Sequence, residues 1–399
     1  MKAFLQHLEG DKAIWAVVAL LALFSFLPVY SASSNLVYVV GNGTTIGHLL
    51  KHGMLLILGF GIIYGMHKIP THYFKGLSII ALPVVILLLI YTLAQGTTIE
   101  GANASRWIHL PVVGITFLTS NLAAVALMIY VARYLSKIRD RRISFKESII
   151  PLWLPVSVIL LLILPANFST AAILFVMVLT LCFLGGYPLK YLIGIVVSGL
   201  AVLALFVLLA KAIPDVFPNR VDTWMSRVES YWDGADGVGD YQIEKAKIAI
   251  ASGGVMGNGA GKSVMKNFLP QSSSDFIYAI IVEEYGLVGG FLLMFLYLLL
   301  LFRIVVVANA NTSVFGKLVV MGVGLPIIFQ ALINMAVAVE LFPVTGQTLP
   351  LISSGGTSIW MTCMAIGVVL SASRNPRMDE EITDKNKEEN PLEVLSGQL

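Results

Sequence analysis

The stretch NFLPQSSSDFIYAIIVEEYG, residues 267–286, carries three acids at the start of a long apolar run. Asp275 stands at the mouth of that run, and Glu283 and Glu284 follow before it resumes at Leu287. Charged groups are costly to place in a bilayer, so acids inside a membrane segment indicate a functional site. A helix that starts near Asp275 rises about 1.5 Å per residue, which places both glutamates roughly 12–14 Å deep, within reach of a water-filled cleft.

The whole chain has the composition of a membrane protein. Of its 399 residues, 57% are hydrophobic and 12% are charged, and the mean hydropathy is +0.85. A soluble domain of this length could not bury so much apolar surface, so the sequence predicts an all-α, polytopic membrane protein. The net charge of +3 is too small to indicate a nucleic-acid partner. Cys182 and Cys363 lie in apolar runs and the six histidines are scattered, so neither a disulfide framework nor a zinc site is expected.

About ten apolar segments are long enough, or nearly so, to cross a bilayer. We expect spans near 13–32, 46–66, 76–95, 111–135, 149–165, 168–187, 189–211, 276–303, 316–340 and 355–374.

Charge then orients these spans. The basic loop from Arg133 to Lys146 follows the fourth span and should be cytoplasmic. Alternation places both termini inside and exposes the long connection at about 212–275, between spans seven and eight, on the outer face. We therefore expect a single membrane domain over residues 1–374, followed by a polar, disordered cytoplasmic tail over 375–399.

The outer connection is too long for a simple link between spans, which makes it a candidate functional loop. Within it, residues 241–251 predict a helix whose apolar residues Ile243, Ala246 and Ile250 face the membrane domain while its charged residues face away.

The glycine-dense segment GGVMGNGAGKS, residues 253–263, superficially resembles a nucleotide-binding phosphate loop. That motif requires glycine where this chain has Met256, and an outer loop meets no ATP, so we reject the nucleotide interpretation. Two interpretations stay open. The backbone amides bind a phosphate with help from Lys262 and Lys266, or the segment is a flexible hinge.

Asp275 also has two interpretations. It caps the helix that follows, because aspartate accepts hydrogen bonds from the free amides of a first turn, or it is a general base at the membrane surface. Residue type alone favours the cap. On one helix Glu283 lies about 80° round from Asp275 and Glu284 lies on the opposite face, so these acids cannot form a close carboxylate pair.

Two outer segments are similarly ambiguous. Arg106 and Trp107 lie at an outer interface, where they serve either as a membrane anchor, which residue type favours, or as a binding site. Residues 342–358, which include Thr345 and Ser354, are uncharged and rich in proline, glycine and hydroxyls. Such backbone either lines a cavity or forms a plain loop.

Taken together, these segments resemble the SEDS family (FtsW/RodA/SpoVE) of shape, elongation, division and sporulation proteins. The resemblance runs from the first span to about Asn375 and follows a series of motifs in order. They are Tyr241-Gln242, residues 253–263, Leu269-Pro270, residues 275–277, residues 283–286, residues 343–346, Leu349-Pro350 and residues 354–356. Residues 334–336 and 345–350 are most similar to the division-type members.

The resemblance implies a peptidoglycan glycosyltransferase that polymerises lipid II on the outer face of the bacterial cytoplasmic (inner) membrane. It implies inverting transfer that forms β-1,4 glycan strands and releases undecaprenyl diphosphate, at the division septum. A class B penicillin-binding protein would be its transpeptidase partner, together with other divisome proteins.

The resemblance also assigns roles to residues. The essential acid of the family falls on Asp275, and the arginine that precedes a tryptophan falls on Arg106. The expected substrate-binding set is Arg106, Trp107, Lys245, Lys247, Lys262 and Lys266, and further candidates for the cleft are Glu283, Glu284, Thr345 and Ser354. A divalent cation, Mg²⁺ or Mn²⁺, is compatible with neutralising the diphosphate, and no organic cofactor is expected.

The chain departs from the family pattern at two places. Residues 118–121 and Ala124 stand where the family has Gln-Pro-Ser-Glu and a lysine, and residues 167–170 stand where it has Asp-Leu-Gly-Thr. These changes argue against charged residues acting there. The rival hypotheses are a lipid II flippase, a non-enzymatic divisome scaffold and an elongation-type polymerase. An outer loop with an acid and several cations favours chemistry over flipping, because a flippase would place its ionisable groups mid-span.

Overall fold

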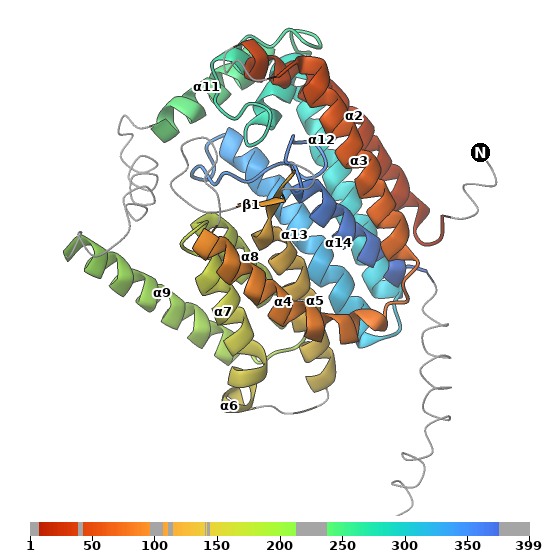
Figure 1. The fold of residues 1–399 in the computed structure, drawn as a ribbon, viewed down its shortest axis with the longest axis vertical. Coiled ribbons are helices and arrows are strands. Elements are labelled where there is room, and N and C mark those ends of the chain that lie inside the picture. The colour runs from red at the N-terminus through yellow and green to blue at the C-terminus, as the bar shows by residue number, and fades with distance from the viewer. Residues whose placement is uncertain are drawn as a thin grey trace, which may run out of the picture.

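The protein is a bundle of apolar helices that run roughly along its long axis (Figure 1). The computed structural model describes residues 8–38, 43–95, 107–110, 115–139, 141, 144–212 and 238–374. The long helices are α2 (Lys12–Tyr38), α3 (Thr45–His67), α4 (Tyr73–Gln95), α5 (Thr119–Ile138), α7 (Leu154–Ile163), α8 (Phe168–Leu184), α9 (Leu189–Ala212), α11 (Val238–Gly253), α12 (Ile277–Ala310), α13 (Val314–Ala338) and α14 (Ser358–Ala372). The short elements are β1 (Trp107–Leu110), β2 (Ile115–Leu118), α6 (Phe145–Ser148), the π-helix Ile149–Trp153 and the 3₁₀ helix Met265–Asn267.

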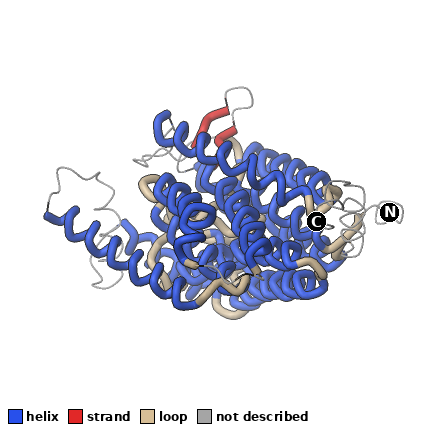
Figure 2. The backbone as a smooth tube through the Cα atoms, turned by 90° about the horizontal axis from the view of Figure 1, so that it is seen from below, coloured by secondary structure: helices blue, strands red, loops and turns tan. Residues whose placement is uncertain are grey.

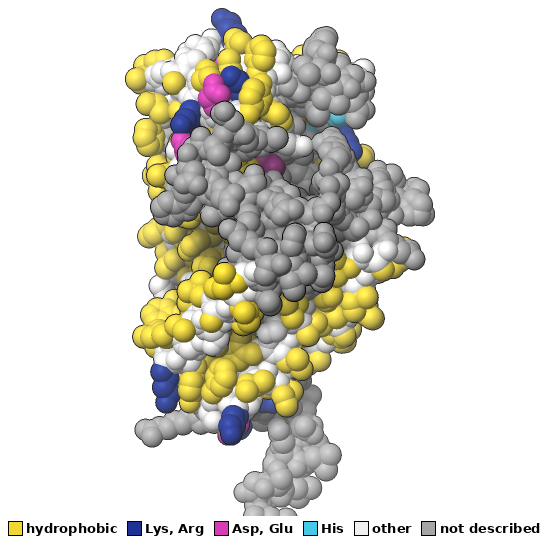
Figure 3. Space-filling model, turned by 90° about the vertical axis from the view of Figure 1, so that its left-hand side faces the viewer, with side chains coloured by type: hydrophobic (Ala, Val, Ile, Leu, Met, Phe, Trp, Pro, Cys, Tyr) yellow, Lys and Arg dark blue, Asp and Glu magenta, His cyan; other side chains and the backbone are white. Residues whose placement is uncertain are grey.

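Seven of the described segments are long and apolar enough to cross a membrane, and three shorter apolar helices accompany them. The shorter ones lie at Phe168–Leu184, Leu189–Val202 and Ser358–Ala372. Each predicted span overlaps one of these helices, so the membrane-protein class is confirmed, while the count of ten crossings stays a prediction. Where described residues are visible in Figure 3, apolar side chains lie between two ends that carry Lys and Arg.

The predicted fourth span began too early. Residues 107–110 and 115–118 pair as an antiparallel hairpin, with Trp107 opposite Leu118, and α5 begins at Thr119 rather than at residue 111. The two strands are rich in aromatic and β-branched residues, which favour strand pairing. The described structure is therefore almost, but not entirely, α-helical (Figure 2).

The predicted fifth span contains an irregular turn. Residues 149–153 form a π-helix that leads into α7, and Pro151 lies inside it. Proline has no amide hydrogen to donate, so it disturbs the regular α-helical ladder, and a π-turn is one way to absorb that disturbance.

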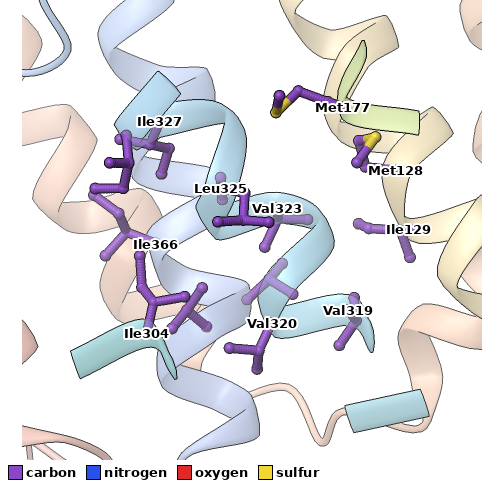
Figure 4. Packing of buried hydrophobic residues seen from close by; sticks show 14 of the residues in the cluster. Met128, Ile129, Met177, Ile304, Val319, Val320, Val323, Leu325, Ile327 and Ile366 are labelled. Carbon is purple, nitrogen blue, oxygen red and sulfur yellow. The ribbon is translucent and has the colours of Figure 1, made fainter. Parts of the chain in front are cut away.

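Helix α13 lies at the centre of the main core. Val320 and Val323 of α13 pack in one buried cluster with Ile304 of α12, Met128 of α5 and Ile366 of α14 (Figure 4). Helix α9, by contrast, extends away from the bundle in both views (Figures 1 and 2).

The start of the first described helix lies against the end of the last one. Asp11 forms an ion pair with Arg303 of α12, and its amide donates to Ser373 Oγ at 2.9 Å. Helix α14 lies along α3, where Trp360 Nε1 donates to the carbonyl of Leu55 at 3.0 Å. Contacts between distant parts of the chain thus close the bundle.

Candidate functional site

Asp275 sits in a tight turn directly before α12. The amides of Ser274, Asp275 and Phe276 all approach the carbonyl of Gln271, at 3.0, 3.1 and 3.3 Å, and Gln271 has a φ of 58°. Helix α12 begins at Ile277, and its cap position is Phe276, which offers no capping side-chain bond. The expected helix start was therefore too early, and the cap position falls one residue beyond Asp275.

A side chain of helix α13 binds the backbone of this turn. Asn334 is a buried side chain, and its Nδ2 donates to the carbonyl of Asp275 at 2.7 Å and to the carbonyl of Gln347 at 2.7 Å. One amide group therefore joins the Asp275 turn to the uncharged segment that follows α13.

That uncharged segment also bonds to the turn directly. Ser353 Oγ donates to the carbonyl of Ser274 at 2.6 Å, and the amide of Ser354 donates to the carbonyl of Ser273 at 2.9 Å. The sequence-derived candidates Thr345 and Ser354 thus lie in the segment that packs against Asp275.

A small pocket opens beside the half-buried Asp275 side chain. A Cβ atom built on Gly346 would lie 3.5 Å from Asp275 Oδ2, so the absence of a side chain at Gly346 leaves room beside the carboxylate. The lining residues are Asp275, Phe276, Asn334, Val337, Val344, Thr345, Gly346 and Gln347. This arrangement favours the cavity-wall interpretation of the 342–358 segment.

The two glutamates lie in a different network. Glu283 accepts hydrogen bonds from Ser263 Oγ and from the amides of Val264 at 2.8 Å and Met265 at 3.2 Å. Each glutamate is only 1% exposed, so neither faces the water-filled cleft expected from the sequence.

Glu284 connects the same loop to the first helix. It accepts from Ser31 Oγ of α2 and from the amide of Ser263 at 3.3 Å, and Lys266 Nζ donates to Ser31 Oγ at 3.0 Å. Burying a carboxylate is tolerable when it is hydrogen-bonded in this way. Glu283 and Glu284 therefore hold the outer loop to the bundle, and neither lines the pocket beside Asp275.

The glycine-dense segment fastens onto a break in α12. Gly286 has φ 68° and ψ −173°, which interrupts the helix and frees backbone groups on both sides. The amides of Asn258 and Gly259 donate to the carbonyls of Glu283 at 3.0 Å and Glu284 at 2.9 Å. In return, the amides of Leu287 and Val288 donate to the carbonyls of Gly254 at 2.9 Å and Val255 at 3.3 Å.

These four bonds contradict the hinge interpretation, while a phosphate contact from other amides of the segment stays a prediction. The amides of Asn258 and Gly259 are bonded to α12, so they do not face a phosphate, and the segment is docked rather than hinged. Glycine is required for close approach, because a Cβ atom on Gly257 would lie 2.3 Å from the carbonyl oxygen of Glu284.

The described cations differ in their surroundings. Lys245 pairs with Glu244 at 3.2 Å, and Lys247 pairs with Glu340 at 2.5 Å. Lys266 is bonded to Ser31 and to the carbonyl of Gly261 at 2.8 Å. Lys262 is exposed. The predicted α11 faces are confirmed, since Ile243 and Ala246 are buried and Ile250 packs against the same cluster.

Arg106 lies outside the described residues, and of Trp107 only the backbone is described. Trp107 pairs with Leu118, whose amide donates to Thr357 Oγ1 at 3.2 Å. The hairpin that follows Arg106 therefore borders the 342–358 segment.

Sequence reasoning gave no separate role to Asn334 or Gln347. Gln347 Nε2 donates to Thr170 Oγ1 of α8 at 2.9 Å, beside Asn167, whose side chain accepts from the amide of Thr170 at 3.2 Å as the cap of α8. A polar residue inside an apolar span was the available signal for Asn334. Among the described residues, no group of three or more His, Cys, Asp or Glu side chains could hold a metal ion.

Comparison with known proteins agrees with this architecture. The family model FtsW/RodA/SpoVE, described as "Cell cycle protein", matches residues 11–378. A probable peptidoglycan glycosyltransferase FtsW from Geobacter sulfurreducens is 31% identical over 373 residues, covering 91% of this chain and 95% of that protein. The FtsW protein of Hydrogenovibrio crunogenus, described in the same words, is 32% identical over 373 residues, covering 91% and 92%.

Two solved structures share the fold. A chain from a peptidoglycan synthase complex, solved to describe the coordination of polymerization and crosslinking, has a TM-score of 0.70 at 25% identity and covers 92% of this chain and 98% of that one. The rod shape determining protein RodA of Thermus thermophilus has a TM-score of 0.65 at 25% identity and covers 92% and 97%. The chain therefore belongs to the FtsW/RodA/SpoVE family of membrane proteins.

Proposed function

We propose that this protein is a peptidoglycan glycosyltransferase that polymerises lipid II at the outer face of the cytoplasmic membrane. Its family membership and the names of its relatives support the activity. The observation that carries the proposal is Asp275, a half-buried acid that lines a small pocket and whose backbone carbonyl is bonded to Asn334 of α13.

In the proposed reaction, Asp275 accepts the proton of the acceptor sugar 4-hydroxyl as that oxygen attacks the anomeric carbon of the donor. The new glycosidic bond forms while the bond from the anomeric carbon to the diphosphate breaks. Direct displacement of an α-linked diphosphate inverts the centre, so the product is a β-1,4 glycan and the leaving group is undecaprenyl diphosphate.

Cations of the outer loop would stabilise the charge on the leaving diphosphate. Lys262 and Arg106 are our first candidates. Lys245, Lys247 and Lys266 would have to exchange the local partners described above for the substrate. The described residues do not build a metal site, so we derive no step through Mg²⁺ or Mn²⁺.

We further propose a division role, with a class B penicillin-binding protein as partner transpeptidase, both termini in the cytoplasm and location at the septum. Support comes from the similarity to a chain of a peptidoglycan synthase complex and from the FtsW relatives. The flippase, scaffold and elongation-type hypotheses are alternative outcomes of the experiments below.

The decisive experiment measures glycan strands made from lipid II by the purified protein and its partner in detergent, where flipping has no meaning. Asp275→Asn keeps the size of the side chain but cannot take up a proton at neutral pH, so polymer yield should fall by about 10²–10⁴-fold. Asp275→Glu displaces the carboxylate by one methylene and should recover little activity.

Glu244→Gln is the matched control, since Glu244 is an exposed acid on α11, and it should polymerise normally. A well-folded Asp275→Asn protein with wild-type polymer yield would refute the general-base role. A wild-type protein that makes no polymer would leave the flippase or scaffold hypotheses ahead.

A further inference from the structure

Asn334 is a buried polar side chain inside the otherwise apolar α13, and its surroundings are unusual. It is 1% exposed, and both bonds from its Nδ2 go to backbone carbonyls, those of Asp275 and Gln347. These two carbonyls fix the orientation of the amide, because a flipped side chain would place its oxygen against two other oxygens. The Oδ1 atom is buried without a hydrogen-bond partner in the described structure.

An orphaned buried acceptor is costly and is rare in native structures, so it calls for an explanation. Both hydrogen bonds of the Asn334 side chain are made by its Nδ2 atom, and both go to backbone carbonyls of the candidate site. Asn334, Asp275 and Gln347 line the same pocket, with Thr345 and Gly346 between them. The Asn334 amide is therefore the side chain that holds the Asp275 carbonyl itself, while Ser353 and Ser354 hold the two residues before it.

We propose that Asn334 is a positioning residue for the glycosyl transfer, holding the Asp275 carboxylate at its working place beside the Thr345–Gly346 wall. This inference rests on the proposed function. It assigns no contact between Asn334 and substrate. Asn334 acts through the carbonyl of Asp275, and errors of about 1 Å in the placement of a reacting group can cost on the order of 100-fold in rate.

The chain offers a closely matched control on the same helix. Gln330 lies four residues earlier, so it occupies the same face of α13 as Asn334. Its Nε2 donates to the carbonyl of Thr348 at 2.8 Å and to Thr348 Oγ1 at 3.3 Å. Gln330 thus bonds the same uncharged segment as Asn334, but none of its bonds reaches the Asp275 turn.

The experiment compares Asn334→Asp with Gln330→Glu in the purified complex with its partner. Each change replaces an amide with a carboxylate of nearly the same shape. An ionised carboxylate cannot donate to a carbonyl. We expect Asn334→Asp to lower kcat by about 10–100-fold at neutral pH while KM for lipid II changes little, and Gln330→Glu to keep kcat within about threefold of wild type.

The pH dependence supplies a second readout. A protonated carboxyl group can donate one hydrogen bond, so the kcat of Asn334→Asp relative to wild type should rise as the pH falls. Among the described residues that line the pocket, the titratable side chain is Asp275, which wild type and variant share. Glu340, just after α13, pairs with Lys247 of α11. Taking the ratio to wild type at each pH corrects for the titration that Asp275 has in the wild-type protein.

Equal kcat for Asn334→Asp and Gln330→Glu, a loss confined to KM, or a kcat ratio that does not change with pH would each overturn the positioning role. If Asn334→Asp cannot be purified folded, Asn334→Ser and Gln330→Ser make the same comparison, with the same expected split between kcat and KM. The two proposals fail separately. A fully active Asp275→Asn protein would refute the general-base role of Asp275. An inactive Asp275→Asn protein together with a fully active Asn334→Asp protein would refute only the positioning role of Asn334.

Discussion

At the level of single residues, Glu283 illustrates how the hydrogen-bond donors of a neighbouring loop can satisfy a buried acid. Its carboxylate gathers three donors from residues 263–265. Glu283→Gln keeps the shape but loses the charge assistance, which should lower the free energy of unfolding by about 1–3 kcal/mol. Glu283→Ala removes all three acceptor bonds and should cost more. Thermal unfolding in detergent checks this, with exposed Glu244→Gln as the control. A Glu283→Gln protein of unchanged stability that makes no polymer would instead place Glu283 in the reaction.

Arg106 gives a second prediction at this scale. If it binds the lipid diphosphate, Arg106→Ala should lower polymerisation by about tenfold or more. Arg106→Lys should rescue only part of that loss, because lysine lacks the planar fork of two parallel donors. The measurement is polymer yield at saturating and limiting lipid II. Nearly normal polymerisation by Arg106→Ala would return the residue to the role of an interfacial anchor.

At the level of elements, adding one methyl group to a glycine tests whether the glycine-dense segment docks on the break of α12. Gly257 and Gly261 both have positive φ, 81° and 77°, but a Cβ atom meets the Glu284 carbonyl at Gly257 and nothing within 4 Å at Gly261. Gly261→Ala should cost about 1–2 kcal/mol, the ordinary penalty of left-handed backbone. Gly257→Ala should cost at least about 3 kcal/mol, because the carbonyl it meets belongs to the helix and cannot move aside.

The two alanine variants are compared by thermal unfolding and by limited proteolysis of the outer loop. Similar stability for both would mean that the segment is not docked as the structure has it, and the hinge interpretation would return.

The elements also show why some features were readable from the sequence and others were not. The apolar face of α11 followed from its periodicity, and it was correct because one face of a helix at 3.6 residues per turn has a simple signature. The break at Gly286 and its docking onto residues 254–259 have no such local signature. The β1–β2 hairpin was hidden because its strands continue an apolar run into α5.

The candidate site divides in the same way. Asp275 was predicted as a site residue from its position at the start of an apolar segment and from the resemblance to a family. The roles of Asn334 and Gln347 depend on bonds to the carbonyls and side chains of distant segments, which periodicity and composition do not encode. Glu283 and Glu284 were recognised as unusual, but their partners were not, because a sequence gives the cost of burying a charge and not the donors that offset it.

For the whole molecule, the proposed orientation in the membrane can be tested by cysteine labelling, because the two native cysteines should contribute little labelling of their own. Cys182 and Cys363 are both buried, so they should react slowly. A cysteine at Met256, which is 81% exposed, should react with an impermeant thiol reagent on cells whose outer barrier has been opened. A cysteine at the exposed Lys146 should react only after the inner membrane is broken. The reverse pattern would contradict both the topology and an outer active site.

The closure of the bundle by its two ends has a consequence for how the protein is made. Asp11 and the Ser373 that bonds its amide are separated by 362 positions, and Trp360 reaches back to Leu55 across 305. A ribosome delivers α2 and α3 long before it delivers α14. During synthesis the early helices must therefore wait in the membrane with lipid or a helper protein against the face that α14 will cover. A chain cut short before Ser358 would retain Asp275 and its pocket residues, yet its first helices would never meet the partner that closes the bundle.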